Sequence, residues 1–283
     1  MTKFIAEISS NHNNNEKRIE KLIQSSAKAG FYAVKFQLFK IDKLFSQEVL
    51  KKSKSHRDRR KWELDIRMID KIVNLAKKNN IKVGFTPFDL DSFHLIKNKS
   101  DFFKISSYDL LRHEFINEII NHNKLTIIST GMSSKKELSE LKKLLSISKN
   151  KKIVVMHCRS LYPCNPQDAH LNFINYLRRK FKFKVGWSDH TNNIFVLYEA
   201  AINLKSDFIE LHVDLDDFKG FEGNVGHCYS IKQVKALIEH VKIRKKILGN
   251  NKFKILKLET NESDWRADPE DGLRPFKKIR KLL

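Results

Sequence analysis

Residues 102–148 have the sequence FFKISSYDLLRHEFINEIINHNKLTIISTGMSSKKELSELKKLLSIS, in which two kinds of segment alternate. Short apolar runs at Phe102–Tyr108 and Lys124–Gly131 are typical of buried strands, whereas Arg112–Asn123 and Lys135–Ser148 carry apolar residues at helical spacing. Ser134 followed by Glu137 matches a capping box, which marks the start of the second helix. The stretch therefore predicts two consecutive strand–helix units of a parallel sheet.

The same alternation extends from residue 3 to about residue 247. The strands predicted in this way are Lys3–Ser9, Tyr32–Leu38, Lys82–Pro87, Phe102–Tyr108, Lys124–Gly131, Lys152–Cys158, Lys184–His190 and Phe208–Leu215. Further helical patterns lie at Glu16–Ala29, Trp62–Lys78 and Ile194–Lys205. Eight strands that alternate with helices close into a (β/α)8 TIM barrel. An open doubly wound sheet is the alternative, but the expected glycine-rich phosphate loop is missing after the first strand.

Two segments do not fit the repeat. Residues 39–61 form a long charged connection after the second strand, and such a loop is expected to cover the mouth of a barrel. Residues 250–283 form a C-terminal tail that is too short to be a second domain. We therefore expect a barrel domain at residues 1–249, followed by the tail at 250–283.

The chain is strongly basic. Its 283 residues include 55 Lys and Arg against 33 Asp and Glu, which gives 55 − 33 = +22 with neutral histidines. The basic residues are spread along the whole chain, so we expect a solvated basic surface that steers anionic substrates rather than a nucleic-acid site. The 41% of hydrophobic residues exclude a disordered chain.

The cysteines and the hydropathy pattern indicate the cellular compartment of the protein. Cys158, Cys164 and Cys228 are odd in number and sparse, which argues against a disulfide framework. No apolar run approaches the roughly 20 residues that cross a bilayer, and no cleavable signal follows Met1. We therefore expect a reduced cytoplasmic protein and no membrane partner.

Polar residues stand at the carboxyl ends of all eight predicted strands. They are Glu7, Lys35, Gln37, Thr86, Lys104, Ser107, Asp109, Ser129, Thr130, His157, Ser188, Asp189, His190, Glu210 and His212. Any one of them can be a cap or a satisfied core group. In a barrel, however, these ends converge on one mouth, where buried polar groups need partners. Together they predict a catalytic mouth.

His190 and His212 end neighbouring strands, so their imidazoles can meet on one divalent metal ion. With oxygen ligands this pair suits Mn(II), and Mg or Zn are alternatives. The other interpretation is that one histidine bonds to a backbone carbonyl. Weaker candidates for the same neighbourhood are Asp189, Glu222 and His227.

Lys35 and Lys104 are expected to point into the mouth, where an ammonium group needs an anion. Hydroxyl groups of Thr86, Ser107, Ser129 and Ser188 lie at neighbouring strand ends. Lysines and hydroxyls together can bind a phosphate and a carboxylate. The alternative interpretation is that a lysine buried in the barrel forms a Schiff base with a substrate.

Several stretches resemble the sialic acid synthase family, which makes N-acetylneuraminic, legionaminic and pseudaminic acids. They are Ala6-Glu7-Ile8, Asn11-His12-Asn13, Ala33-Val34-Lys35-Phe36-Gln37, Phe85-Thr86-Pro87-Phe88-Asp89, Lys104-Ile105-Ser106-Ser107, Ser129-Thr130-Gly131-Met132, His157-Cys158-Arg159-Ser160-Leu161-Tyr162-Pro163, Gly186-Trp187-Ser188-Asp189-His190-Thr191 and Ile209-Glu210-Leu211-His212. They follow the family's order over residues 3–230. The resemblance implies a barrel synthase that joins phosphoenolpyruvate to an open-chain N-acetylated hexosamine, giving a nine-carbon 2-keto acid and phosphate.

The resemblance also implies roles for single residues. His190 and His212 would bind the metal, which polarises the sugar aldehyde. Phosphoenolpyruvate would be held by Lys35, Thr86, Lys104, Ser107, Ser129, Ser160 and Ser188. The sugar would be faced by Glu7, Gln37, Asp109, Tyr162 and Glu222. Catalysis itself would fall to Glu7, Lys35 and Asp109, with Glu7 placing or deprotonating a water or protonating the new alkoxide.

The likeness is strongest to a short branch of the family. Longer members continue into an antifreeze-like domain that supplies an arginine for the N-acetyl group and joins two subunits. Here Arg266 or Arg274 of the tail would substitute, or the acceptor differs, and a homodimer would need other contacts. The alternatives are a related barrel synthase or aldolase with a different sugar acceptor, and a non-catalytic basic protein that binds polyanions. The latter predicts a contiguous basic face and a steep salt dependence.

Overall fold

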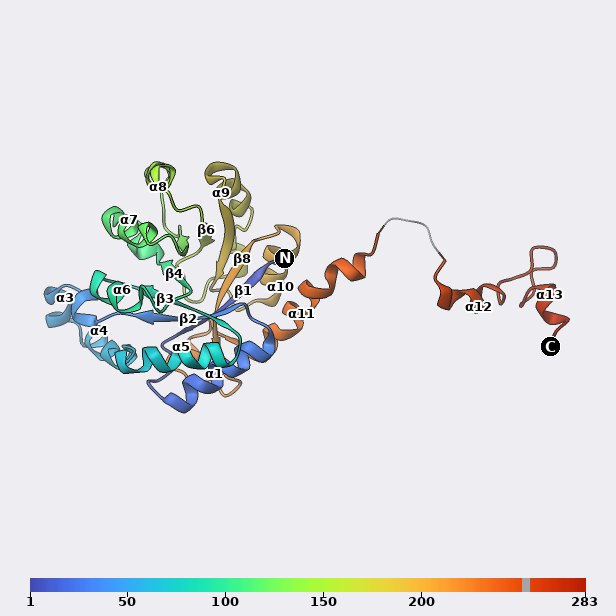
Figure 1. Cartoon of the computed structure of the whole chain (residues 1–283), viewed down its shortest axis with the longest axis horizontal. Coiled ribbons are helices and arrows are strands. Elements are labelled where there is room, and N and C mark those ends of the chain that lie inside the picture. Colours follow the sequence, from blue (N-terminus) through green and yellow to red (C-terminus); the bar gives the residue numbers. More distant parts are fainter. Residues whose placement is uncertain (251–254) are drawn as a thin grey trace. The chain divides into compact units, whose positions relative to one another are not determined.

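Figure 1 shows the computed structural model of the chain, which describes residues 1–250 and 255–283, without the side chain of residue 245. The chain forms two compact units, Met1–Ile243 and Arg244–Leu283. The units divide a few residues before the expected domain boundary, within helix α11 (Ile231–Leu248). The first unit contains the barrel, and the second contains the short helices α12 (Thr260–Ser263) and α13 (Lys277–Arg280).

The predicted (β/α)8 TIM barrel is confirmed. Its strands are β1 (Lys3–Ser9), β2 (Ala33–Leu38), β3 (Lys82–Pro87), β4 (Phe102–Ile105), β5 (Leu125–Ser129), β6 (Ile153–Cys158), β7 (Lys184–Asp189) and β8 (Phe208–Asp214). Each strand pairs in parallel with the next, and β1 pairs with β8 to close the ring. A short strand, β9 (Tyr229–Ser230), extends the end of β8. In the closing pair, Glu7 lies opposite His212, so polar ends of the first and last strands meet.

Helices surround the strands in the order predicted by the sequence (Figure 1). They are α1 (Glu16–Ala29), α5 (Ile69–Lys78), α6 (Leu90–Ile96), α7 (His113–Asn121), α8 (Lys135–Ile147), α9 (Phe173–Phe181) and α10 (Ile194–Tyr198). In α1, the buried residues Ile19, Leu22 and Ile23 share one face and join the main apolar cluster. The capping box at Ser134 and Glu137 is present at the start of α8.

Several elements end earlier or later than predicted, each for a local reason. β4 ends at Ile105 instead of Tyr108, because the Ser106 hydroxyl accepts a hydrogen bond from the Tyr108 amide and starts a 3-10 turn. The helix expected from Trp62 begins only at Ile69, after a short turn capped by Asp65. The helix expected at Ile194–Lys205 is α10 followed by a π-helical turn at Glu199–Asn203.

The charged connection at residues 39–61 is folded. It contains α2 (Ile41–Leu44), α3 (Gln47–Lys52) and α4 (Lys54–Asp58). Phe39, Ile41 and Leu50 form a small apolar core with Phe88, which itself lines the barrel mouth. The connection therefore supports one wall of the mouth.

The interior of the barrel changes from apolar to polar along the strands. A buried cluster separate from the main core consists of Ile5, Ala33, Phe102, Ile127, Val154, Met156 and Phe208. Two residues further along the same strands are Glu7, Lys35, Lys104, Ser129, Cys158 and Glu210. Because residues i and i+2 of a strand share a face, the polar layer lies directly over the apolar one.

We expect alanine at position 84 to destabilise the barrel by about 1–3 kcal/mol. A Cβ atom on Gly84 would lie 2.2 Å from the ring of Phe102, which fills the barrel interior and cannot move without opening it. Urea unfolding of Gly84→Ala measures the effect, and Ser146→Ala on the exposed side of α8 is the control. Equal stability of the Gly84→Ala variant and the wild type would contradict a packed interior.

All three cysteines are buried free thiols, as expected from the sequence. Within the described residues, the structure contains no helix that combines the length and the apolar character needed to cross a membrane.

Candidate active site

A small pocket of about 50 Å³ opens at the carboxyl ends of the strands. The sequence-predicted site residues that line it are Glu7, Lys35, Gln37, Thr86, Lys104, Ser107, Ser129, Tyr162, Ser188, His190 and His212. Ser160 and Glu222 are not part of the lining but contact the lining residues Ser107 and His212, respectively. Asp109 does neither.

A cluster of two lysines and two glutamates forms the floor of the pocket. Lys35 forms an ion pair with Glu7 and donates a hydrogen bond of 2.6 Å to Thr86 Oγ1. Lys104 donates to Glu210 Oε1 at 3.0 Å, and Glu210 Oε2 lies 4.0 Å from Lys35 Nζ. All four groups are buried. The anion that the sequence predicted for the lysines is therefore supplied, in the free protein, by two carboxylates.

The electrostatics of this cluster favour a neutral or readily neutralised Lys35. Burial lowers the pKa of Lys35 to about 7, although Glu210 raises it in part. Burial would raise the pKa of Glu210, but Lys104 and Lys35 outweigh that effect and hold this pKa well below its usual range. Glu210 is thus an anion at neutral pH, and Lys35 can gain a proton when a further anion arrives.

Hydroxyl groups border the lysines on the other side of the pocket. Ser188 Oγ donates to Glu210 Oε1 at 3.2 Å, and the hydroxyls of Ser107 and Ser160 are 3.0 Å apart. Ser129 Oγ is buried and has no hydrogen-bond partner among the described residues. Such a group is an available donor for an anion in the pocket.

The two predicted metal ligands lie together at the rim. The ring centres of His190 and His212 are 5.4 Å apart, and the Tyr162 ring is 4.1 Å from that of His190. His190 Nδ1 is 2.5 Å from the carbonyl oxygen of Arg159, so the carbonyl contact that the sequence left open is present. Such a contact fixes the tautomer and leaves Nε2 as the ligand atom. Burial, followed by the effect of His212, lowers the pKa of His190 to about 3, which keeps the imidazole in its neutral, ligating form.

Three candidate residues have other partners. Asp109 lies on the 3-10 turn after β4 and pairs with Arg112 at 2.8 Å, so it turns away from the pocket lining. Asp189 accepts hydrogen bonds from Trp187 Nε1 and Tyr229 Oη, each at 2.8 Å, and thereby joins β7 to β9. His157 Nε2 is 2.9 Å from the Ala169 carbonyl oxygen.

Glu210 is the pocket residue to which the sequence gave no role. It stands two positions before His212 on β8, and this spacing puts both side chains on the inner face. Its place at the mouth was predicted, whereas its contact with Lys104, 106 positions away in the chain, was not. Phe88, Ser106 and Cys158 also line the pocket without having been predicted.

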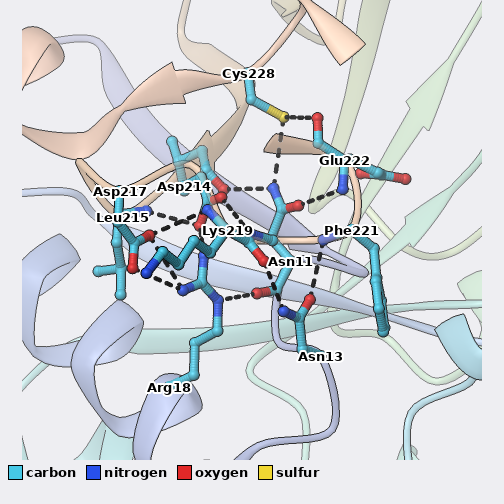
Figure 2. A network of polar contacts seen from close by, with 12 residues as sticks. Asn11, Asn13, Arg18, Asp214, Leu215, Asp217, Lys219, Phe221, Glu222 and Cys228 are labelled. Carbon is cyan, nitrogen blue, oxygen red and sulfur yellow. Dashed lines mark hydrogen bonds and ion pairs between the residues drawn. The ribbon is translucent and has the colours of Figure 1, made fainter. Parts of the chain in front are cut away.

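The loop after β8 is held by the Asn-His-Asn turn after β1 (Figure 2). Asn11 donates to the Val213 carbonyl at 2.9 Å and accepts from the Glu222 amide at 2.8 Å. Asn13 accepts from the Phe221 amide at 2.9 Å. Arg18 forms an ion pair with Asp214 and donates to the Asn11 carbonyl at 2.7 Å. These contacts fix the backbone of Glu222, whose Oε2 lies 3.3 Å from His212 Nδ1.

Lysines, carboxylates and imidazoles converge at the carboxyl ends of a closed barrel, which is where barrel enzymes have their active sites. The chain belongs to the NeuB family, whose sequence profile matches residues 22–253. The family resemblance predicted from the strand-end motifs is confirmed.

Named relatives agree with this assignment. The N,N'-diacetyllegionaminic acid synthase of Campylobacter jejuni is 32% identical over 273 residues, covering 91% of this chain and 80% of the relative. The pseudaminic acid synthase of the same species is 28% identical over 262 residues, covering 88% and 76%. The structure of N-acetylneuraminic acid synthetase from Leptospira borgpetersenii in complex with citrate is similar at a TM-score of 0.80 and 25% identity, covering 92% of this chain and 90% of that one.

Proposed function

We propose that the chain condenses phosphoenolpyruvate with the aldehyde of an N-acetylated hexosamine, which gives a nonulosonic 2-keto acid and phosphate. Membership in the NeuB family supports the reaction class. The observation that carries the proposal is that Lys35 and Lys104, with their hydroxyl neighbours, line the same pocket as the imidazoles of His190 and His212. The free, buried thiols support a cytoplasmic location.

The anionic substrate would occupy the lysine side of the pocket. Its phosphate and carboxylate would be held by Lys35, Thr86, Lys104, Ser107, Ser129, Ser160 and Ser188. Glu7 and Glu210 hold the two lysine side chains in place before the substrate arrives. This preorganisation lowers the cost of binding because the lysines need not be ordered by the substrate.

The imidazoles of His190 and His212 fit a divalent metal, for which we propose Mn(II), with Mg or Zn as alternatives. When bound there, the ion would supply Lewis-acid polarisation of the sugar aldehyde. Gln37, Tyr162 and Glu222 lie around this side and would contact the sugar. Asp109 pairs with Arg112 outside the lining, so it would reach a sugar only after leaving that ion pair.

Glu7 and Lys35 would accept and donate the protons of the reaction. C3 of the enol forms the new bond to the aldehyde carbon, water adds to C2, and phosphate leaves. Glu7 accepts hydrogen bonds from the Ser9 amide at 2.8 Å and from Gln37 at 3.4 Å, and it contacts Lys35. These contacts fix the carboxylate where it can place or deprotonate the water, or return a proton to the alkoxide.

The acceptor sugar is proposed only as a class. Purified protein with phosphoenolpyruvate, Mn(II) and a panel of hexosamines tests the reaction. Phosphate should be released only when an acceptor is present, and no release with any acceptor would refute the proposal.

Binding of phosphoenolpyruvate at pH 8 is expected to take up close to one proton. With a pKa of about 7, Lys35 is mostly neutral at pH 8, and a bound anion raises this pKa so that the amine is protonated. Calorimetry in buffers of different ionisation enthalpy measures the uptake. The Lys35→Met variant should show none, and a buffer-independent enthalpy for the wild type would contradict the role of Lys35.

A further inference from the structure

Four residues on one side of His212 form a compact set of metal-ligating atoms. They are His212, Glu222, His227 and Cys228, and one ligand atom of each lies within 4.8 Å of the others. His190 is not a member of this set. The set combines two imidazoles, a carboxylate and a thiol, whereas the pair proposed above consists of His190 and His212.

His227 is the residue that points to a ligand. Its side chain is only 3% exposed, yet neither ring nitrogen has a hydrogen-bond partner among the described residues. Buried polar groups without partners are uncommon, because leaving water without a new hydrogen bond is unfavourable. The rings of His212 and Tyr162 lie 4.6 and 5.3 Å away, centre to centre, so the imidazole faces other ligand groups rather than a backbone carbonyl.

The spacing of the set suits a small divalent ion. His212 Nδ1 and Glu222 Oε2 are 3.3 Å apart. Two ligand atoms that bind one ion tetrahedrally at about 2.0–2.1 Å are themselves separated by about 3.3 Å. The separation of these two atoms is therefore compatible with binding to a common ion.

The loop that carries the set is rigidly held (Figure 2). Asn11 contacts both of its ends, because its amide nitrogen lies 3.5 Å from Cys228 Sγ and its amide oxygen accepts from the Glu222 backbone. The Cys228 thiol in turn lies 3.4 Å from the Glu222 carbonyl oxygen. A Cβ atom on Gly220 would lie 2.4 Å from Asn11 Oδ1, so the loop packs tightly onto this side chain. Ligands fixed in this way need little reordering to bind an ion.

We propose that His212, Glu222, His227 and Cys228 form a cation cage, distinct from the His190–His212 pair, that binds Zn²⁺ or a similar borderline transition metal. A thiolate and two imidazoles favour such ions over Mg²⁺. Binding breaks the S–H bond of Cys228, and the proton leaves to solvent while the sulfur electron pair goes to the ion. Because His212 belongs to both sets, an ion in the cage competes with one on the proposed catalytic pair, and this consequence alone rests on the proposed function.

Titration of the metal-free protein with Co²⁺, followed by absorption, tests the cage without any substrate. The wild type should bind one equivalent and show a thiolate-to-cobalt charge-transfer band, which Cys228→Ser should lose. His227→Phe keeps a buried ring but no ligand nitrogen, so it should fold normally and weaken binding more than about 100-fold. His190→Ala should keep both the affinity and the band.

Three outcomes would refute the proposed cation cage. Absence of the band in the wild type, unchanged affinity in His227→Phe, or loss of the band in His190→Ala would each refute it. Thermal unfolding of every metal-free variant checks that the fold is intact. Failure of the proposed reaction would appear separately, as missing phosphate release by the Mn(II)-loaded wild type.

Discussion

Replacement of Lys104 by methionine is expected to lower kcat/KM for phosphate release by about 10²- to 10⁴-fold. Lys104 is buried and binds Glu210 Oε1 at 3.0 Å, at the floor of the pocket where the anionic substrate is proposed to lie. Methionine keeps much of the side-chain volume but supplies neither the charge nor the hydrogen-bond donors. Steady-state assays of phosphate release measure the loss.

The same substitution should also destabilise the fold by about 3–5 kcal/mol, because it leaves the Glu210 carboxylate buried without its nearest partner. A second substitution, Glu210→Gln, removes that unpaired charge. The double variant should therefore recover most of the free energy of unfolding while remaining inactive. Urea unfolding of the single and double variants separates the two effects.

The double variant distinguishes two roles of Lys104, which are neutralisation of Glu210 and binding of the substrate. Recovery of activity together with stability would mean that Lys104 only neutralises Glu210 and does not bind the substrate. Loss of activity in a variant of normal stability is the result that we expect. Lys82→Met is the control, since Lys82 pairs with Asp101 at the exposed end of β3, outside the pocket lining. It should leave kcat/KM unchanged.

The fold could be predicted from periodicity alone. Alternation of apolar runs with helical segments placed all eight strands, because each strand is buried on both faces and each helix buries one. Two of the differences in element boundaries fall where a short polar side chain forms a hydrogen bond with the local backbone. Ser106 ends β4 early and Asp65 delays α5, and neither effect depends on hydrophobic pattern.

The inner layer of the site could also be predicted, because strand residues two apart share a face. This placed Lys35, Lys104 and Ser188 correctly at the mouth. Their partners could not be predicted, since Glu210 meets Lys104 only through the register of distant strands. Asp109 was expected to face the sugar, but the 3-10 turn that replaces the end of the predicted strand directs it to Arg112.

The loop after β8 has no periodicity that a sequence pattern could exploit. Glu222, His227 and Cys228 come together because Asn11, more than 200 positions earlier in the chain, holds the backbone between them. Asn11-His12-Asn13 was recognised as part of the family resemblance. Its structural role as the anchor of a distant loop emerges only from the contacts in Figure 2.

Replacement of His190 by alanine is expected to abolish metal-dependent activity, with a loss of at least about 10³-fold, while the protein remains folded. Lewis-acid polarisation contributes several kcal/mol to a transition state, and each 1.4 kcal/mol corresponds to about tenfold in rate. The neutral imidazole is held by the Arg159 carbonyl with its other nitrogen available. Phosphate release across a range of Mn(II) concentrations measures the loss, and thermal unfolding checks the fold.

His157 supplies the matched control for this substitution. It is another buried histidine at a strand end, but it contacts the Ala169 carbonyl and packs 5.0 Å from the Trp187 ring, outside the pocket. His157→Asn should lower the melting temperature and keep the dependence of the rate on Mn(II), because its imidazole lies outside the pocket that contains His190. A His190→Ala variant that stayed active would remove the metal from the mechanism, whereas equal losses in both variants would show that any buried histidine at this end of the barrel acts through stability.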